Sequence, residues 1–304
     1  MQASRRSYGH VSPPSQWTRP VSLPPLARIA AVVVVCGAIV ALALLLTGHR
    51  GSGAVSSPAE KVRVQRRVAR LFADLPQHGV ILGRRSAPVT LQVFVDLEDY
   101  ADGTNWFNFQ LPAILKQLVR PGIVRLEFHS FKTDTLNGGP FVTQQTAALA
   151  AGAQNRLWNY AATFIGEQGT EFTNYANEAF VTGIAEQVPG LNIAKWERSR
   201  TVAMSKIVMA DNYNARYRLG FHATPAFRIG LTGGHMKNFS GRTIIVLPKY
   251  VVRTRPSGER YIAGVSHKLQ HPVSLIDAND LKKAVEELVC PRRSSCPATA
   301  LRQH

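Results

Sequence analysis

The alternation of apolar and polar positions predicts a strand, a turn, a helix and a second strand in the middle of the chain. Residues 89–95 alternate and are rich in β-branched side chains, which is typical of a strand. Apolar residues at helical spacing follow over 106–118, and residues 123–131 alternate again. This order implies that the two strands pair in parallel through a right-handed crossover.

Carboxylates fill the turn between the first strand and the helix. The turn runs from Asp96 to Asp102 and also contains Glu98 and Asp99. A helix N-terminus presents free N–H groups and a positive dipole end, so we expect Asp99 and Asp102 to cap the helix. Two alternatives are a metal site that adds His222 to these carboxylates and acid–base chemistry by the carboxylate pair. Because no spacing matches a calcium-binding loop, we expect neither a metal nor a cofactor.

Helices dominate the chain after the second strand, and extended segments return near its end. Apolar spacing predicts helices over 141–155, 157–168, 177–188, 193–219 and 281–289. Short extended segments are predicted over 226–229, 244–247, 250–255 and 260–265, with a turn at Pro256-Ser257-Gly258.

One apolar run stands apart from this domain. Residues 29–46 contain no charged side chain, and that length is about the minimum for a helix that spans a bilayer. We therefore predict an uncleaved transmembrane helix at 28–47; the alternative is a cleaved signal peptide with Ser52-Gly53-Ala54 as its small-x-small site. The Pro-, Ser- and Arg-rich residues 1–27 are predicted to be a disordered tail. Positive charges lie on both sides of the span, so they do not fix its orientation.

A linker and an amphipathic helix, over 48–77, are predicted to join the span to the domain. Ser57 and Glu60 form a capping box around Pro58, and Val64, Val68 and other apolar residues follow on one stripe. The helix is expected to dock on the domain through this stripe. The alternative is that its basic face lies on the membrane.

The net charge of +17 raises the question of a nucleic-acid partner. The arginines are spread along the chain, and no basic motif is interleaved with aromatic residues. We therefore expect no nucleic-acid partner and interpret the charge as a solvated surface near anionic lipid headgroups.

Three stretches carry a family resemblance. The first comprises Leu82-Gly83 and residues 86–90 and 93–96. The second is the alanine-rich segment 147–160, which includes Leu157-Trp158-Asn159-Tyr160, and the third is 220–227, which contains Thr224-Pro225. In this order they resemble the DsbA-like disulfide oxidoreductases over residues 78–290. The resemblance implies an α/β, thioredoxin-like fold with an inserted helical domain, here preceded by one transmembrane helix. It also implies that the domain is extracytoplasmic and the N-terminal tail cytoplasmic.

The resemblance gives the acidic turn a meaning. In that family the turn holds a Cys-x-x-Cys pair at a helix N-terminus, where the first thiol becomes a reactive thiolate. Asp99 and Asp102 stand at those two positions, so the spacing is kept while the sulfur is lost. A carboxylate cannot exchange disulfides, so we expect no catalytic residue in this degenerate redox site.

The segment Thr224-Pro225 is the second expectation that rests on the resemblance. In that family the proline is cis, and the backbone before it pairs with an extended peptide. We expect Thr224 and Pro225 to form such a peptide-binding segment; the alternative is that Pro225 merely shapes the turn.

The three cysteines are Cys36, Cys290 and Cys296, and none forms a Cys-x-x-Cys or a zinc-like cluster. Cys290 and Cys296 frame 291–295 after the last helix, and we expect a disulfide between them. The chain is thus predicted to be a membrane-anchored polypeptide-binding or scaffold protein of the cell envelope. The alternative is a thiol-disulfide oxidoreductase of the envelope that uses Cys290 and Cys296. The domain is predicted to span 78–290 and to be followed by a tail at 291–304.

Overall fold

The computed structural model describes residues 57–100, 102–241, 243–258 and 260–290. The predicted N-terminal tail at 1–27, the span at 28–47, most of the linker and the tail at 291–304 lie outside these residues. Within the described residues, no helix combines the length and the apolar character that crossing a bilayer requires.

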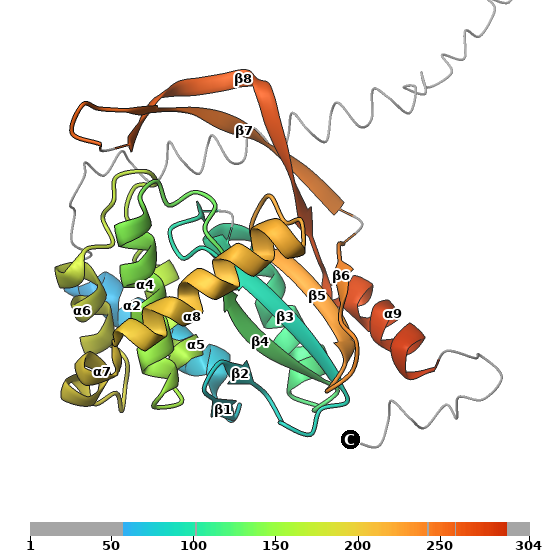
Figure 1. Ribbon diagram of the computed structural model, residues 1–304. Helices are drawn as coiled ribbons and strands as arrows, with labels where there is room; N and C mark the ends of the chain where they lie inside the picture. The colour runs from blue at the N-terminus through green and yellow to red at the C-terminus, as the bar shows by residue number, and fades with distance from the viewer. Residues whose placement is uncertain (1–56, 101, 242, 259, 291–304) are drawn as a thin grey trace, which may run out of the picture. The chain divides into compact units, whose positions relative to one another are not determined.

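A six-stranded sheet forms the centre of the domain (Figure 1). Its strands are β1 (Gln77–His78), β2 (Ile81–Leu82), β3 (Val89–Val95), β4 (Val124–Ser130), β5 (Ala226–Leu231) and β6 (Lys237–Phe239), in the order β1-β2-β4-β3-β5-β6. Strands β3 and β4 are parallel, as the sequence predicts, and β5 pairs antiparallel to β3. The central strand β3 is buried on both faces apart from Gln92, so even its polar Thr90 is buried, as expected for a strand that is covered on both faces.

The crossover from β3 to β4 is helical throughout but unusually wound. It consists of η1 (Asp102–Gln110), α3 (Leu111–Ile114) and η2 (Leu115–Val119), of which η1 and η2 are π-helical. The helix therefore begins at Asp102, four residues before the start that the apolar spacing predicts, because the first turn carries polar residues and leaves no apolar signal. π-Helical turns are often found at functional sites, and η1 follows the acidic turn directly.

The inserted helices between β4 and β5 are α4 (Gly138–Gly152), α5 (Leu157–Gly166), α6 (Glu178–Glu186), α7 (Ile193–Ser199), α8 (Val202–Tyr213) and η3 (Asn214–Arg218). In Figure 1, α4 to α7 gather on one side of the sheet and α9 (Ala278–Val289) lies at the other. The prediction of one helix over 193–219 is wrong, because the chain breaks at Arg200. Thr201 caps α8 by accepting a hydrogen bond from the Met204 amide, and a capping side chain favours a new helix start over a continuous helix.

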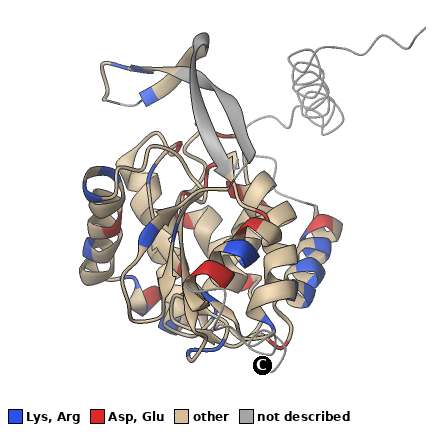
Figure 2. Ribbon diagram, turned by 90° about the vertical axis from the view of Figure 1, so that its right-hand side faces the viewer, with Lys and Arg blue, Asp and Glu red and all other residues tan. Residues whose placement is uncertain are grey.

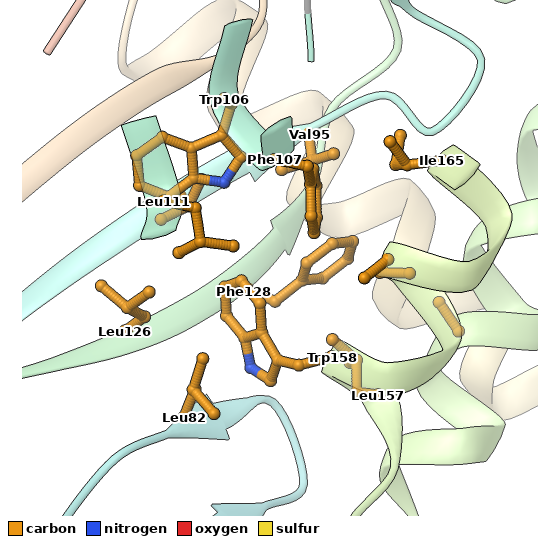
Figure 3. Packing of buried hydrophobic residues seen from close by; sticks show 14 of the residues in the cluster. Leu82, Val95, Trp106, Phe107, Leu111, Leu126, Phe128, Leu157, Trp158 and Ile165 are labelled. Carbon is orange, nitrogen blue, oxygen red and sulfur yellow. The ribbon is translucent and has the colours of Figure 1, made fainter. Parts of the chain in front are cut away.

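Aromatic side chains join the sheet, η1 and α5 in one core (Figure 3). The Trp158 ring stands edge-on to Phe128, with their centroids 6.0 Å apart, and its Nε1 donates to the Val80 carbonyl at 3.0 Å. Trp106 of η1 packs on Phe227 of β5 at 5.0 Å. These contacts fix the first turn of η1 against the sheet.

The helix α2 (Pro58–Phe72) begins with the predicted capping box. Its buried residues Val64, Val68 and Phe72 belong to the core of the domain. The docking interpretation is therefore confirmed for the apolar stripe, which is not free to enter a membrane.

Two long strands form a separate ribbon after β6. Strands β7 (Thr243–Thr254) and β8 (Arg260–Leu275) pair antiparallel with each other (Figure 1). The sequence predicts three shorter segments here, because Pro248 ends the first of them after residue 247. The strand continues through Pro248 with a register shift; a proline is tolerated at the edge of a sheet, where no ladder hydrogen bond needs its missing N–H.

Candidate functional site

The acidic turn, residues 96–102, lies at the carboxyl end of β3. Since β3 and β4 are parallel, the loop after β4 meets the turn at the same edge of the sheet, where α/β folds place their ligands. Asp96 ties the two loops together. Its Oδ2 accepts hydrogen bonds from the amides of Thr133, Asp134 and Thr135 at 2.9, 3.1 and 2.9 Å, and its Oδ1 accepts from the Thr135 hydroxyl at 2.5 Å.

Asp99 lies in a triangle of oxygen atoms. Its Oδ2 lies 3.1 Å from the Thr133 hydroxyl and 2.5 Å from the Thr224 hydroxyl, and the two hydroxyls are 2.6 Å apart. Both hydroxyls donate to the Asp99 carboxylate, so this cluster ties the acidic turn to the loop after β4 and to the segment before Pro225.

Asp102 is fully buried beside this triangle. Its Oδ2 accepts a hydrogen bond from the Asp96 amide at 2.8 Å, and its Oδ1 has no partner among the described residues. Burial and the neighbouring Asp99 raise the pKa of Asp102 well above its ordinary value, while the nearby Thr224 hydroxyl acts in the opposite direction. The prediction that Asp102 caps the helix is wrong, because its carboxyl bonds back to the turn.

Asp134 and Glu171 complete a group of carboxylates that the sequence analysis missed. One oxygen each from Asp99, Asp134 and Glu171 lie within 4.8 Å of one another. Glu171 belongs to the loop between α5 and α6, and its Oε1 accepts from the Tyr100 amide at 2.5 Å. The position of Asp134 after a strand parallel to β3 is a signal that could have revealed it. The position of Glu171 depends on how the helical insert folds back.

Burial raises the pKa values of this group. The pKa of Asp134 is raised to about 7 by burial and by Glu171, and that of Glu171 to about 8 by burial and by Asp99. Glu98, also buried, reaches about 8 because of burial and Asp96. Lys132 opposes the rise at Glu98 and at Asp134. The described neighbours therefore do not offset the burial of these carboxyls, which keep their protons to a higher pH than exposed carboxyls do.

Gln168 fixes the backbone of the acidic turn. Its Nε2 donates to the carbonyls of Leu97 and Asp99 at 2.8 and 3.1 Å. A Cβ on Gly103 would lie 2.3 Å from the Gln168 Oε1, so the glycine leaves room for this side chain.

The Thr224–Pro225 bond is cis, as the resemblance implies. The side chain of Thr224 is fully buried against Asp99, and Pro225 is also buried. Neither side chain is therefore open to a peptide, and the prediction that the backbone of this segment binds an extended peptide stays a prediction. The exposed part of the segment is its backbone at the half-buried Ala223, whose N–H and C=O form no hydrogen bond with the described residues.

The remaining predicted residues lie elsewhere. His222 is exposed and does not belong to the carboxylate group found among the described residues. Cys290 follows the last residue of α9 and is disulfide-bonded. Cys296 lies outside the described residues, so the pairing of Cys290 with Cys296 stays a prediction. Figure 2 shows Lys and Arg spread over several elements, without a single basic face in this view.

Comparisons with known proteins place these features in context. A sequence model of the family described as thioredoxin matches residues 76–236. No curated protein sequence matches the chain. The structure is similar to that of α-DsbA1 from Wolbachia pipientis, with 15% identity, 71% of this chain and 91% of that chain covered, and a TM-score of 0.47. BdbD from Bacillus subtilis in its oxidised form is 13% identical, with 71% of this chain and 98% of that chain covered and a TM-score of 0.48. DsbA2 from Pseudomonas aeruginosa is 16% identical, with 70% of this chain and 96% of that chain covered and a TM-score of 0.42.

Proposed function

The chain belongs to the thioredoxin family, and from this premise we propose that it is a membrane-anchored, extracytoplasmic member that binds extended polypeptide without redox catalysis. It would serve as a holdase or as a scaffold for another envelope protein. The proposal combines the predicted span at 28–47 with the geometry of the acidic turn and of the segment before Pro225.

The chemistry of the turn supports the absence of redox catalysis at this position. Asp99 and Asp102 lie between the end of β3 and the start of η1, and Thr224 next to the cis-proline contacts Asp99 directly. Carboxylates cannot form the mixed disulfide through which thiol–disulfide exchange proceeds. In addition, the exposed fractions of Asp99 and Asp102 are 3% and 0%, so neither is presented to a large substrate.

One observation carries the binding proposal. The backbone N–H and C=O of Ala223 have no partner among the described residues, although most backbone groups in a folded protein are paired. An extended peptide that lies alongside would pair with them, as in β-augmentation. Phe221, half-buried against Phe94, and Tyr100, which is 45% exposed, offer apolar contacts for its side chains.

Site-specific crosslinking tests the binding proposal. A photoreactive amino acid at Ala223 of the full-length, membrane-integrated protein is expected to crosslink to polypeptides, whereas one at the exposed Lys282 of α9 serves as the background control. Ala223→Pro removes the free N–H and is expected to reduce binding, while Ala223→Ser keeps the N–H and retains it. Equal crosslinking from both positions would contradict the proposal.

The alternative enzyme is tested by insulin reduction. The full chain and the Cys290→Ser/Cys296→Ser variant are both expected to be inactive. Activity that the double variant loses would overturn the non-catalytic proposal in favour of an oxidoreductase.

The proposed topology needs its own measurement. Protease added outside intact spheroplasts is expected to digest the domain and to leave the N-terminal tail protected. Protection of the domain would contradict an extracytoplasmic location.

A further inference from the structure

We propose that the outer face of α8 and η3, which consists of the exposed side chains of residues 202–218, docks on a bilayer surface that contains anionic lipid. The inference rests on the membrane anchor of the proposed function but not on polypeptide binding. Three features carry it: the apolar side chains that this helix exposes, the sign of the charge among them, and the short chain that precedes the domain.

The helix turns its large apolar side chains towards solvent. Five of them are between 51% and 75% exposed, namely Val202, Ile207, Met209, Tyr213 and Tyr217. Positions 202, 209, 213 and 217 follow one another at helical spacing and form one stripe, and the rings of Tyr213 and Tyr217 lie 4.9 Å apart. In Figure 1, α8 crosses the near side of the sheet, and no other described element is drawn in front of it. A contiguous exposed apolar surface of this kind marks an interaction site.

Polar contacts on the inner side of the helix hold it in this orientation. Asp211 Oδ1 lies 3.1 Å from the His129 ring on β4. Asn212 Oδ1 accepts from the Lys132 amide at 2.9 Å, and Arg216 donates to the Lys132 carbonyl at 2.7 Å. The exposed apolar side chains therefore cannot turn inwards without breaking these contacts.

Charge indicates the kind of partner. Lys206 and Arg218 are exposed beside the apolar side chains, whereas Asp211, the single carboxylate in 202–218, is bonded to His129. The net charge of +17 opposes association with a second copy and favours an anionic surface. Tyrosines next to lysine and arginine are typical of helices that lie at the level of lipid headgroups. An anionic bilayer therefore matches both the apolar and the basic residues of the outer face.

The chain before the domain keeps a bilayer within reach. The predicted span ends at residue 47, and the described structure begins at Ser57. The residues between them, 48–56, extend over at most roughly 30 Å, and the start of α2 is held on the domain by its buried side chains. This tether raises the local concentration of lipid at the domain, so a docking contact of modest affinity is sufficient.

Lipid crosslinking in the full-length protein tests the docking. The protein carries p-benzoylphenylalanine in place of Tyr213 and is reconstituted in nanodiscs of phosphatidylcholine, with or without phosphatidylglycerol. Mass spectrometry is expected to show lipid adducts that increase at least about threefold with phosphatidylglycerol. The same amino acid at Glu286, an exposed position on α9, serves as the background control and is expected to show no such increase.

Charge variants test the specificity of the face. Lys206→Gln/Arg218→Gln is expected to lose the increase that phosphatidylglycerol causes at position 213. Lys282→Gln/Lys283→Gln on α9 removes the same charge from another exposed surface and is expected to retain the increase.

Three results would overturn the docking: equal adduct yields in the two kinds of disc, an unchanged increase in the Lys206→Gln/Arg218→Gln variant, or an equal loss in the α9 variant. Crosslinking to a protein instead of lipid in native membranes would also reject it. Failure of the anchor gives a different result, because the chain then does not co-purify with the discs. Sedimentation of the chain with phosphatidylglycerol vesicles then decides: its loss in Lys206→Gln/Arg218→Gln supports the docking, and no sedimentation of the wild type rejects it.

Discussion

At the scale of single residues, Asp96 acts as a clamp between two loops rather than as a reactive group. Each of its oxygens is committed, with three backbone amides on Oδ2 and the Thr135 hydroxyl and the Glu98 amide on Oδ1. Its full burial shows that these hydrogen bonds replace water. The clamp positions Asp99 and Asp134 on facing loops.

Removal of this clamp is expected to be strongly destabilising. Asp96→Ala leaves four backbone amides without this acceptor, and each orphaned donor costs about 1–3 kcal/mol. Relief of the repulsion from Glu98 and Asp134 offsets part of the cost, so we expect a loss of about 3–5 kcal/mol in the free energy of unfolding. Urea denaturation measures this. Glu197→Ala, at an exposed position on α7, is the control and is expected to change stability by less than about 0.5 kcal/mol.

His129 makes a second contact that depends on charge. Its Nδ1 lies 3.1 Å from Asp211 Oδ1 on α8, its Nε2 lies 3.0 Å from Glu127 Oε1, and its ring stacks on Phe94 at 4.8 Å. Burial acts to lower the pKa of His129, but the hydrogen bonds and charges of Asp211 and Glu127 outweigh it and raise the pKa to about 9. The imidazolium thus links α8 to the sheet at neutral pH.

The charged contacts of His129 predict that the free energy of unfolding falls as the pH rises from 6.5 to 9. The unfolded His129 loses its proton near pH 6.5 and the folded one near pH 9, so the folded chain binds more protons between these values. The stabilisation is complete below pH 6.5 and is lost as the pH rises to 9; it amounts to about 3 kcal/mol. The measurement is the difference between the pH profiles of the wild type and His129→Asn. A difference that stays constant from pH 6 to 9 would contradict it.

At the scale of elements, α2 belongs to the folded domain and is not a free connector. Besides its apolar stripe, its last carbonyls at Leu71 and Ala73 accept hydrogen bonds from the Arg120 guanidinium at 2.9 and 2.5 Å. An arginine at this end also opposes the negative end of the helix dipole. The chain that precedes Ser57 therefore joins the domain at a fixed point.

A substitution in the buried stripe of α2 is expected to destabilise the whole domain. Phe72 is 5% exposed, and Phe72→Ala is predicted to cost about 3–5 kcal/mol because it leaves a cavity in the core. Val62→Ala on the same helix, at a side chain that is 44% exposed, is expected to be nearly neutral. Thermal unfolding of both variants gives the comparison. Similar melting temperatures for Phe72→Ala and the wild type would mean that α2 does not contribute to the cooperative unit.

At the scale of the whole molecule, the sequence correctly predicted the features that depend on interactions between neighbouring residues. Strand β3, the turn that follows it and the capping box of α2 each depend on neighbouring residues, and the structure agrees with the sequence at all three. The break at Arg200 was missed because the apolar spacing continues through it, although Thr201 carried a capping signal. The length of β7 was underestimated, because a proline such as Pro248 interrupts a central strand but is tolerated in an edge strand.

The composition of the site could be predicted only in part. Asp99, Asp102 and Thr224 were found because they are close in sequence to a strand end or belong to a resemblance. Asp134 and Glu171 lie 35 and 72 positions after Asp99, and their approach depends on the fold of the helical insert. Burial of the carboxylates likewise depends on how the whole molecule packs. It raises their pKa values, an effect that their spacing in the sequence does not reveal.

The buried carboxylates predict how the stability of the molecule depends on pH. In the unfolded chain Glu98 and Glu171 lose their protons near pH 4.5, whereas in the folded chain they keep them until about pH 8. The folded chain therefore binds more protons between these values, and its free energy of unfolding falls by several kcal/mol as the pH rises. Urea denaturation in the presence of a chelator, from pH 5 to pH 8, measures the fall. Glu98→Gln/Glu171→Gln removes two titrating groups and is expected to flatten the profile. A wild type that becomes more stable over this range would show that the carboxylates are ionised and paired in the folded molecule, which contradicts the charge arrangement described above.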